Sequence, residues 1–196
     1  MAAHSQLPEK ILDAALARAN EIGWKHVRLH DVADDIGISL ADVYRAFPDL
    51  DAVGTALLMR ADRAMLNVAG RRGFDKLPAR ERLRRVIMAW FETLAPHRCH
   101  VRAILRYKFA VAHIHLQAAL IMRLSRTVQW IREASKLDAV GLRHDVEEIG
   151  LTLLFVATVM HWLSSRSDDL QSTNSSLARR LDRADIVMAR LWPPQG

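Results

Sequence analysis

The chain has 196 residues, of which 51% are apolar and 26% charged, with 8 Gly, 6 Pro and a single Cys. This balance is typical of a folded protein and excludes a disordered or collagen-like chain. One cysteine cannot close an intrachain disulfide, and no secretion signal is evident at the N-terminus, so we expect a cytoplasmic protein. The longest uncharged run, residues 149–165, is shorter than the roughly 20 apolar residues that span a bilayer, so we expect a buried helix and no membrane insertion.

The net charge of +6 is unevenly distributed along the sequence. Residues 1–50 carry five basic and eight acidic side chains, whereas residues 51–100 carry ten basic and five acidic ones. A basic protein often binds a polyanion, but the position of the charge decides which segment does so. The basic run allows contact with DNA flanks, contact with an anionic membrane surface, or simple solvation. Its members are Arg71, Arg72, Lys76, Arg80, Arg82, Arg84 and Arg85.

Apolar residues recur at helical spacing over nearly the whole chain, and no alternating stretch is long enough for a strand. The sequence therefore predicts an all-α fold. In the N-terminal quarter, a first helix ends at Gly23 and a short helix covers residues 29–36. Another short helix begins after Ser39, with Asp42 in the capping-box position, and ends near Phe47. Asp49 is placed to cap the next helix, which continues to about Ala69.

Five longer amphipathic helices are predicted beyond the linker at residues 70–78, over residues 78–94, 97–110, 113–136, 145–165 and 174–191. The fourth is apolar around most of its circumference, and the fifth has apolar residues at alternating spacings of four and three. This pattern favours a four-helix dimer interface, although both helices could instead bury into the core of their own chain. The predicted interface residues are Leu151, Val159, Trp162, Leu177, Leu181, Ala184 and Met188.

Residues 29–47 have the spacing of a helix-turn-helix motif. Ala33 is small where two helices cross, and Gly37 lies where the turn needs a positive φ. Val43 is the apolar residue that anchors the second helix on the first. That helix would present its outer face to the major groove of double-stranded DNA. The predicted DNA-contacting residues are Arg28, His30, Ser39, Leu40, Ala41, Tyr44 and Arg45.

Residues 10–53 resemble the N-terminal domain of TetR-family transcriptional regulators. The resemblance rests on Ile11-Leu-Asp-Ala-Ala15, Gly23, Val32-Ala33, Ile36-Gly37-Ile38-Ser39, Val43-Tyr44 and Phe47. It implies a three-helix DNA-binding domain over residues 1–49 and a larger helical domain over residues 50–196 that binds a small molecule and forms a homodimer. The function it implies is that of a ligand-responsive repressor, without enzymatic activity, on a pseudopalindromic operator.

Several residues depart from the TetR pattern. Arg28 and Asp42 stand where the family often has Thr or Ser, Ala46 where it has His or Tyr, and Leu50 where it has Lys. Binding to duplex DNA depends on neutralising phosphates, so an acidic segment with Asp42 on its reading face starts at an electrostatic disadvantage.

These departures make an alternative relevant. The chain also resembles the Coq9-type proteins, which are TetR-fold lipid-binding proteins of ubiquinone biosynthesis. The similarity lies in Ile11-Leu-Asp-Ala-Ala-Leu16, Gly23-Trp24, Leu94-Ala-Pro96, Val128-Gln-Trp130, Trp162-Leu and Ser167-Asp-Asp169. It implies a TetR fold that binds lipid and no longer binds DNA. The turn over residues 36–47 favours the regulator over this alternative.

Large side chains in the second part of the chain predict a pocket between helices for a small apolar effector with one or two polar anchors. Each of them could equally be an ordinary core residue. The predicted lining residues are Trp90, His97, His100, Tyr107, Met122, Trp130 and Phe155.

The sequence predicts no metal, cofactor or catalytic site. His97, Cys99 and His100 lack the second Cys or further ligands that a zinc site needs. No phosphate-binding glycine loop, paired catalytic carboxylates or Ser/His/Asp signature is present. We therefore expect a binding protein and not an enzyme.

Overall fold

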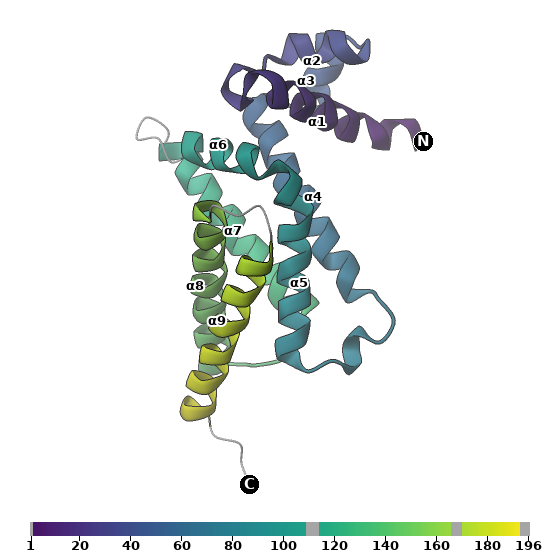
Figure 1. Ribbon diagram of the computed structural model, residues 1–196. Coiled ribbons are helices and arrows are strands. Elements are labelled where there is room, and N and C mark those ends of the chain that lie inside the picture. Colours follow the sequence, from purple (N-terminus) through teal and green to yellow (C-terminus); the bar gives the residue numbers. More distant parts are fainter. Residues whose placement is uncertain (1, 109–113, 166–169, 193–196) are drawn as a thin grey trace. The chain divides into compact units, whose positions relative to one another are not determined.

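The computed structural model describes residues 2–108, 114–165 and 170–192, with the backbone alone for residues 2–5, 107–108 and 114–121. Helices occupy nearly all of these residues and none of them is in a strand, which confirms the predicted all-α fold (Figure 1). The elements are α1 (Ala2–Ile22), η1 (Trp24–His26), α2 (Leu29–Ile36), α3 (Leu40–Ala46), α4 (Leu50–Ala69), η2 (Phe74–Lys76), α5 (Ala79–Leu94), η3 (Ala95–His97), α6 (Arg98–Lys108), α7 (Ile114–Ala134), α8 (Leu142–Ser164) and α9 (Leu170–Leu191).

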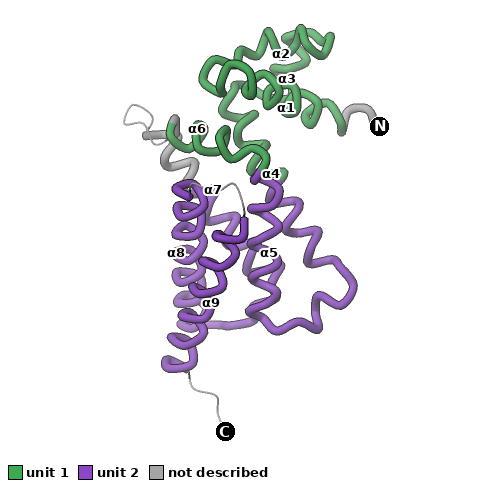
Figure 2. The backbone as a smooth tube through the Cα atoms, in the orientation of Figure 1, with its two compact units in different colours: residues 1–60, 96–117 green, residues 61–95, 118–196 purple. Residues whose placement is uncertain are grey.

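The chain divides into two compact units (Figure 2). Unit 1 comprises residues 1–60 and 96–117, and unit 2 comprises residues 61–95 and 118–196. Helices α4 and α7 each contribute residues to both units. The division expected from the sequence is by function, into residues 1–49 and 50–196. The two units are defined by compactness instead, so the functional division stays a prediction.

In unit 1, α1 packs against α2 and α3. Their shared core contains Ile11, Val32 and Val43, which are fully buried. The turn between α2 and α3 depends on Gly37, whose backbone lies in the left-handed region at φ 67° and ψ 39°, where a side chain would be strained. The turn, the short helices and the anchoring role of Val43 confirm the helix-turn-helix geometry predicted from the sequence.

Both predicted caps are present in unit 1. The Asp42 amide donates to Ser39 Oγ at 3.1 Å, and the Ser39 amide donates to Asp42 Oδ2 at 3.2 Å, which completes the capping box of α3. At the start of α4, the Ala52 amide donates to Asp49 Oδ1 at 2.7 Å. Further along α4, Gly54 allows close packing, because a Cβ there would lie 3.2 Å from Trp24 and 3.3 Å from Ile104.

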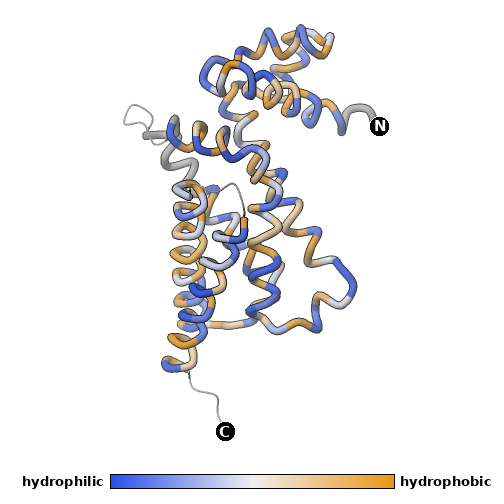
Figure 3. The backbone as a smooth tube through the Cα atoms, in the orientation of Figure 1, coloured by the Kyte–Doolittle hydropathy of each residue, from blue (hydrophilic) through white to orange (hydrophobic). Residues whose placement is uncertain are grey.

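In unit 2, α9 packs against both α8 and α5. An aromatic cluster joins α5 to α8, with ring centroids 5.1 Å apart for Trp90 and Phe155 and 5.4 Å apart for Phe91 and Trp162. Helix α8 is hydrophobic along much of its length (Figure 3). Among the described helices it alone has the length and composition of a membrane span, a test that core helices of soluble proteins also pass.

Candidate functional site

All seven residues predicted to contact DNA are at least partly solvent-exposed. Arg28 and His30 lie at the start of α2, and Ser39, Leu40, Ala41, Tyr44 and Arg45 lie at the start and on the outer face of α3. Tyr44 is the most open of the large apolar or aromatic side chains on α3, at 70% exposure. Val43, the residue before Tyr44, is fully buried and anchors the helix in the core of unit 1.

The outer face of α3 also has an apolar hollow of about 450 Å³. Leu40, Ala41 and Tyr44 from α3 line it together with Leu29 of α2 and the Phe47-Pro48 segment that follows α3. An apolar reading face can contact thymine methyl groups in the major groove, or it can bind another apolar partner.

Asp42 forms an ion pair with Arg45 one turn later on α3. It also accepts a hydrogen bond from the Ser39 hydroxyl at 2.6 Å. The hydrogen bonds from Ser39, with a further contribution from Arg45, hold the pKa of Asp42 below its usual range. Asp42 therefore caps the helix as an anion and engages the guanidinium that was predicted to contact DNA.

Other acidic side chains of unit 1 are also paired with arginines. Arg18 of α1 donates to both carboxylate oxygens of Asp35, at 2.5 and 2.8 Å, and lowers the pKa of that carboxyl group. Arg60 of α4 pairs with Glu9 at 2.6 Å and with Asp13 at 2.7 Å. The excess of acidic residues counted over residues 1–50 thus overstates the negative charge of unit 1, because Arg60 belongs to that unit but lies outside the count.

Most of the residues predicted at a dimer interface are engaged within unit 2. Leu151, Val159, Trp162, Leu177 and Leu181 are buried, whereas Ala184 and Met188 are partly buried. The exposed large apolar residues on the same two helices are others: Leu142, Ile149, Leu153 and Met160 on α8, and Ile186, Val187 and Leu191 on α9. Burial of the first set attaches α8 and α9 to each other and to α5, and leaves the second set facing solvent.

The residues predicted to line one pocket are distributed over both units. Trp90 and Phe155 belong to the buried aromatic cluster of unit 2. His97 and His100 belong to unit 1, where His100 Nε2 lies 2.8 Å from Asn20 Oδ1. Met122 and Trp130 lie exposed on α7. The side chain of Tyr107 lies outside the described residues. A single pocket within one unit thus does not contain the whole predicted set.

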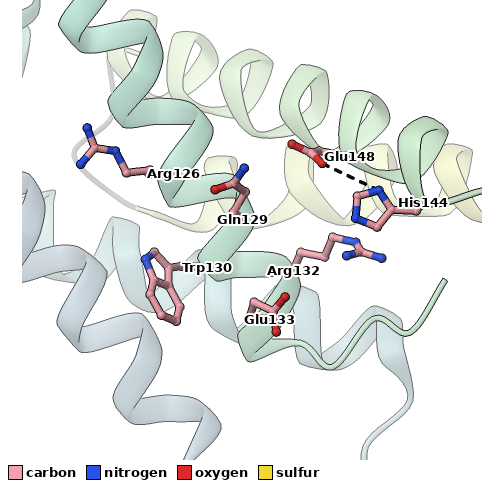
Figure 4. A pocket seen from close by; sticks show the side chains of 7 residues that line it. All are labelled: Arg126, Gln129, Trp130, Arg132, Glu133, His144 and Glu148. Carbon is pink, nitrogen blue, oxygen red and sulfur yellow. Dashed lines mark ion pairs between the residues drawn. The ribbon is translucent and has the colours of Figure 1, made fainter. Parts of the chain in front are cut away.

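Trp130 lines a pocket of about 460 Å³ in unit 2, formed between α7 and α8 (Figure 4). The indole, which is 51% exposed, shares this pocket with polar side chains of both helices. His144 Nδ1 lies 3.9 Å from Glu148 Oε2 on α8, and Arg132 Nη2 donates to the carbonyl oxygen of Ala139 at 2.8 Å. The remaining lining residues are Arg126, Gln129 and Glu133. This lining is more polar than the sequence analysis expected for an effector pocket.

Sequence reasoning missed a polar cluster around Asp62 in unit 2. The carboxylate accepts hydrogen bonds from the Trp90 indole at 3.0 Å, from Arg123 Nη2 at 2.5 Å and from the Thr127 hydroxyl at 3.2 Å. Burial raises the pKa of Asp62 although Arg123 opposes the shift. The sequence signal that could have revealed this cluster is the position of Asp62, because a carboxylate there lies at helical spacing from two apolar residues, Leu58 and Met65. Within the described part of the chain, no three His, Cys, Asp or Glu side chains are grouped as metal ligands.

Comparison with known proteins identifies a relative among solved structures. The crystal structure of the TetR transcriptional regulator from Nitrosomonas europaea ATCC 19718 matches with a TM-score of 0.82 and 34% sequence identity. The match covers 92% of this chain and 98% of that one. No family model and no curated protein matches the chain. The identity and the near-complete coverage extend well beyond the helix-turn-helix motif, and the chain therefore belongs to the TetR family of transcriptional regulators.

Proposed function

We propose that this TetR-family chain is a cytoplasmic, ligand-responsive repressor that binds a pseudopalindromic DNA operator as a homodimer. The observation that supports DNA binding most directly is the exposed outer face of α3, whose helix is fixed by a buried Val43 and a complete capping box. Tyr44 and Arg45 on this face can contact phosphates or base edges. Arg28, which is exposed at the start of α2, adds a second cation.

The proposed dimer uses the exposed apolar faces of α8 and α9. Ile149, Leu153 and Met160 recur at helical spacing on α8, and all three are largely exposed. If this face packed against the same face of a second copy across a two-fold axis, the three residues would be buried in an isologous interface. Such a dimer would place its two recognition helices about one turn of DNA apart, roughly 34–36 Å, which explains the expectation of a pseudopalindromic site.

The proposed effector site lies in unit 2, and the pocket beside Trp130 is our candidate for it. The indole offers an apolar surface, and Arg126 and Arg132 offer charged anchors. An effector that binds better to the conformation unable to contact DNA must weaken DNA binding by the same factor by which DNA weakens effector binding.

The proposal is tested by titrating the purified protein with pooled fragments of its own genome at two salt concentrations and sequencing the bound fraction. We expect a palindromic sequence to be enriched and its affinity to fall steeply with salt, because lysine and arginine contacts release counterions from phosphates. A complete lack of enrichment at low salt would contradict DNA binding.

Two substitutions locate the DNA contact. We expect Tyr44→Ala and Arg45→Ala each to reduce operator affinity at least tenfold, and Arg45→Ala also to lower the salt slope by about one. Lys136→Ala removes the same charge from an exposed position after α7, outside the segments proposed to contact DNA, and serves as the control. Unchanged affinity in both α3 variants would exclude a major-groove role for this face.

A second candidate function is lipid binding of the Coq9 type without DNA binding. The apolar hollow beside Leu40 and Tyr44 and the pairing of Arg45 with Asp42 favour it, because both lower the electrostatic attraction of α3 for phosphates. A lipid carrier should copurify with an isoprenoid or phospholipid, which mass spectrometry of the organic extract would detect. The two candidates are distinguished by which of the two ligands the same preparation binds.

A further inference from the structure

Unit 2 contains a second hollow, of about 310 Å³, on which four arginine side chains converge. Arg71 and Arg72 reach it from the turn after α4, and Arg84 and Arg85 reach it from α5. Asn174 of α9 also lines it. This volume lies at the small end of the range of about 300–1,000 Å³ that is typical of ligand sites.

Two of the four guanidinium groups are fixed in position. Arg84 donates from Nε to Glu81 Oε2 at 2.9 Å and from Nη1 to Asn174 Oδ1 at 2.9 Å. Arg85 Nε donates to Glu81 Oε1 at 2.7 Å. The two arginines share this one carboxylate and lower the pKa of Glu81 to about 2. Their combined charge is therefore only partly neutralised.

The other two guanidinium groups, of Arg71 and Arg72, are exposed and have no side-chain partner among the described residues. Their backbone is nevertheless ordered by local contacts, since the Phe74 amide donates to the carbonyl oxygen of Arg71 at 3.1 Å and the Phe74 ring is buried. Of the described residues that line the hollow, Glu92 is the one with a carboxylate. The hollow thus combines two anchored and two uncompensated guanidinium groups with a single acidic side chain in its lining.

We propose that this hollow binds the phosphate group of a small organic phosphate. Guanidinium groups donate paired hydrogen bonds that match phosphate oxygens, and several of them together compensate a dianion. Asn174 uses its oxygen for Arg84, which leaves its amide NH₂ available as a further donor. Val68, Phe74 and Met88 supply an apolar floor for the organic part of the ligand. This site shares no lining residue with the pocket beside Trp130 or with the hollow on α3.

Size and depth favour a small ligand over a polymer or a membrane. A duplex or a lipid surface would contact the exposed Arg71 and Arg72, but a half-buried Asn174 and a buried Met88 are reached only by a molecule that enters the hollow. A role for Asn174 in binding therefore distinguishes a small organic phosphate from a duplex or a lipid surface, which also carry phosphate groups.

The test is isothermal titration calorimetry of the full chain with phenyl phosphate and with inorganic phosphate. We expect phenyl phosphate to bind at least threefold more tightly, because only its ring can use the apolar floor. Arg71→Gln combined with Arg72→Gln should weaken phenyl phosphate binding at least tenfold. Lys10→Gln combined with Arg106→Gln removes the same charge from exposed positions of unit 1 and should change it less than twofold.

Asn174→Asp provides a second variant that keeps an acceptor for Arg84 but introduces a negative charge and removes the amide donor. We expect an unchanged melting temperature and at least fivefold weaker phenyl phosphate binding. An equal loss in the control double variant, or no preference for phenyl phosphate, would overturn the proposal. It would also be overturned if phosphatidylglycerol vesicles or a 20-base-pair duplex bound through Arg71 and Arg72, with no effect of Asn174→Asp and no binding of phenyl phosphate.

Discussion

The indole nitrogen of Trp90 on α5 donates a 3.0 Å hydrogen bond to Asp62 Oδ1 on α4, inside unit 2. Arg123 and Thr127 of α7 donate to the same carboxylate. A single, partly buried acidic group thus links three helices. A carboxylate in this position is costly unless its oxygens are satisfied, so the three donors specify how the helices pack as well as stabilise them.

Replacing Trp90 with Phe should destabilise the protein by about 1–3 kcal/mol, because it removes a donor from the partly buried carboxylate of Asp62 while retaining most of the aromatic packing. Chemical denaturation followed by circular dichroism measures the effect. Trp130→Phe is the matched control, since that indole is half exposed, and its effect should stay within about 0.5 kcal/mol. Equal effects of the two substitutions would show that the hydrogen bond to Asp62 contributes nothing.

Asp42→Asn should strengthen DNA binding by about fivefold at moderate salt, because it removes a negative charge from α3 and releases Arg45 for a phosphate. The amide oxygen of the new side chain can still accept from the Ser39 amide, so the helix should remain capped. Fluorescence anisotropy with the recovered operator measures the change, with Glu21→Gln on α1 as the charge control. Weaker binding of the Asp42→Asn variant would instead indicate that Asp42 reads a base, such as cytosine through its amino group.

Leu153→Glu should convert the proposed dimer to a monomer, because it places a charge in the centre of the exposed apolar face of α8. Leu153 is 66% exposed, so the substitution should leave the fold of the protomer intact. Size-exclusion chromatography with light scattering measures the mass. Val140→Glu, at an even more exposed position before α8, is the control and should remain dimeric. A dimeric Leu153→Glu variant would exclude this face as the interface.

Stability should fall as the pH drops below about 6.5, the usual pKa of a histidine ring. Burial lowers the pKa of His97 and His100, so the folded state holds both rings neutral while the unfolded chain takes up protons near the usual value. The loss begins at the unfolded pKa and levels off once the pH is below the lowered folded pKa, with a slope of at most about 1.4 kcal/mol per pH unit for each ring.

Urea denaturation at pH 7.5 and 5.5 measures this dependence. His100→Gln should reduce the difference in unfolding free energy between the two pH values, whereas His26→Gln, which replaces an exposed ring, should not. An unchanged pH difference in His100→Gln would assign the effect to other groups.

The local sequence determined where α2 ends and where α3 and α4 begin, whereas α8 begins three residues and α9 four residues before the positions predicted for them. Gly37, Ser39 with Asp42, and Asp49 act on backbone groups within a few residues, so their effect can be read without knowing the fold. The outward face of α3 was predictable for the same reason. Once Val43 is assigned to the core, helical geometry directs Tyr44 and Arg45 away from it.

The tertiary structure decided which of several apolar faces is covered. Helical periodicity shows that Leu151 and Leu153 lie on different faces of α8, but only the packing of α9 and α5 makes the first residue core and the second surface. Trp90 and Trp130 were both predicted to line a pocket, yet the first is buried and the second is half exposed. The pairing of Arg18 with Asp35 and of Arg60 with Glu9 spans 17 and 51 residues, so the partners of these charges in unit 1 depend on contacts that no local pattern specifies.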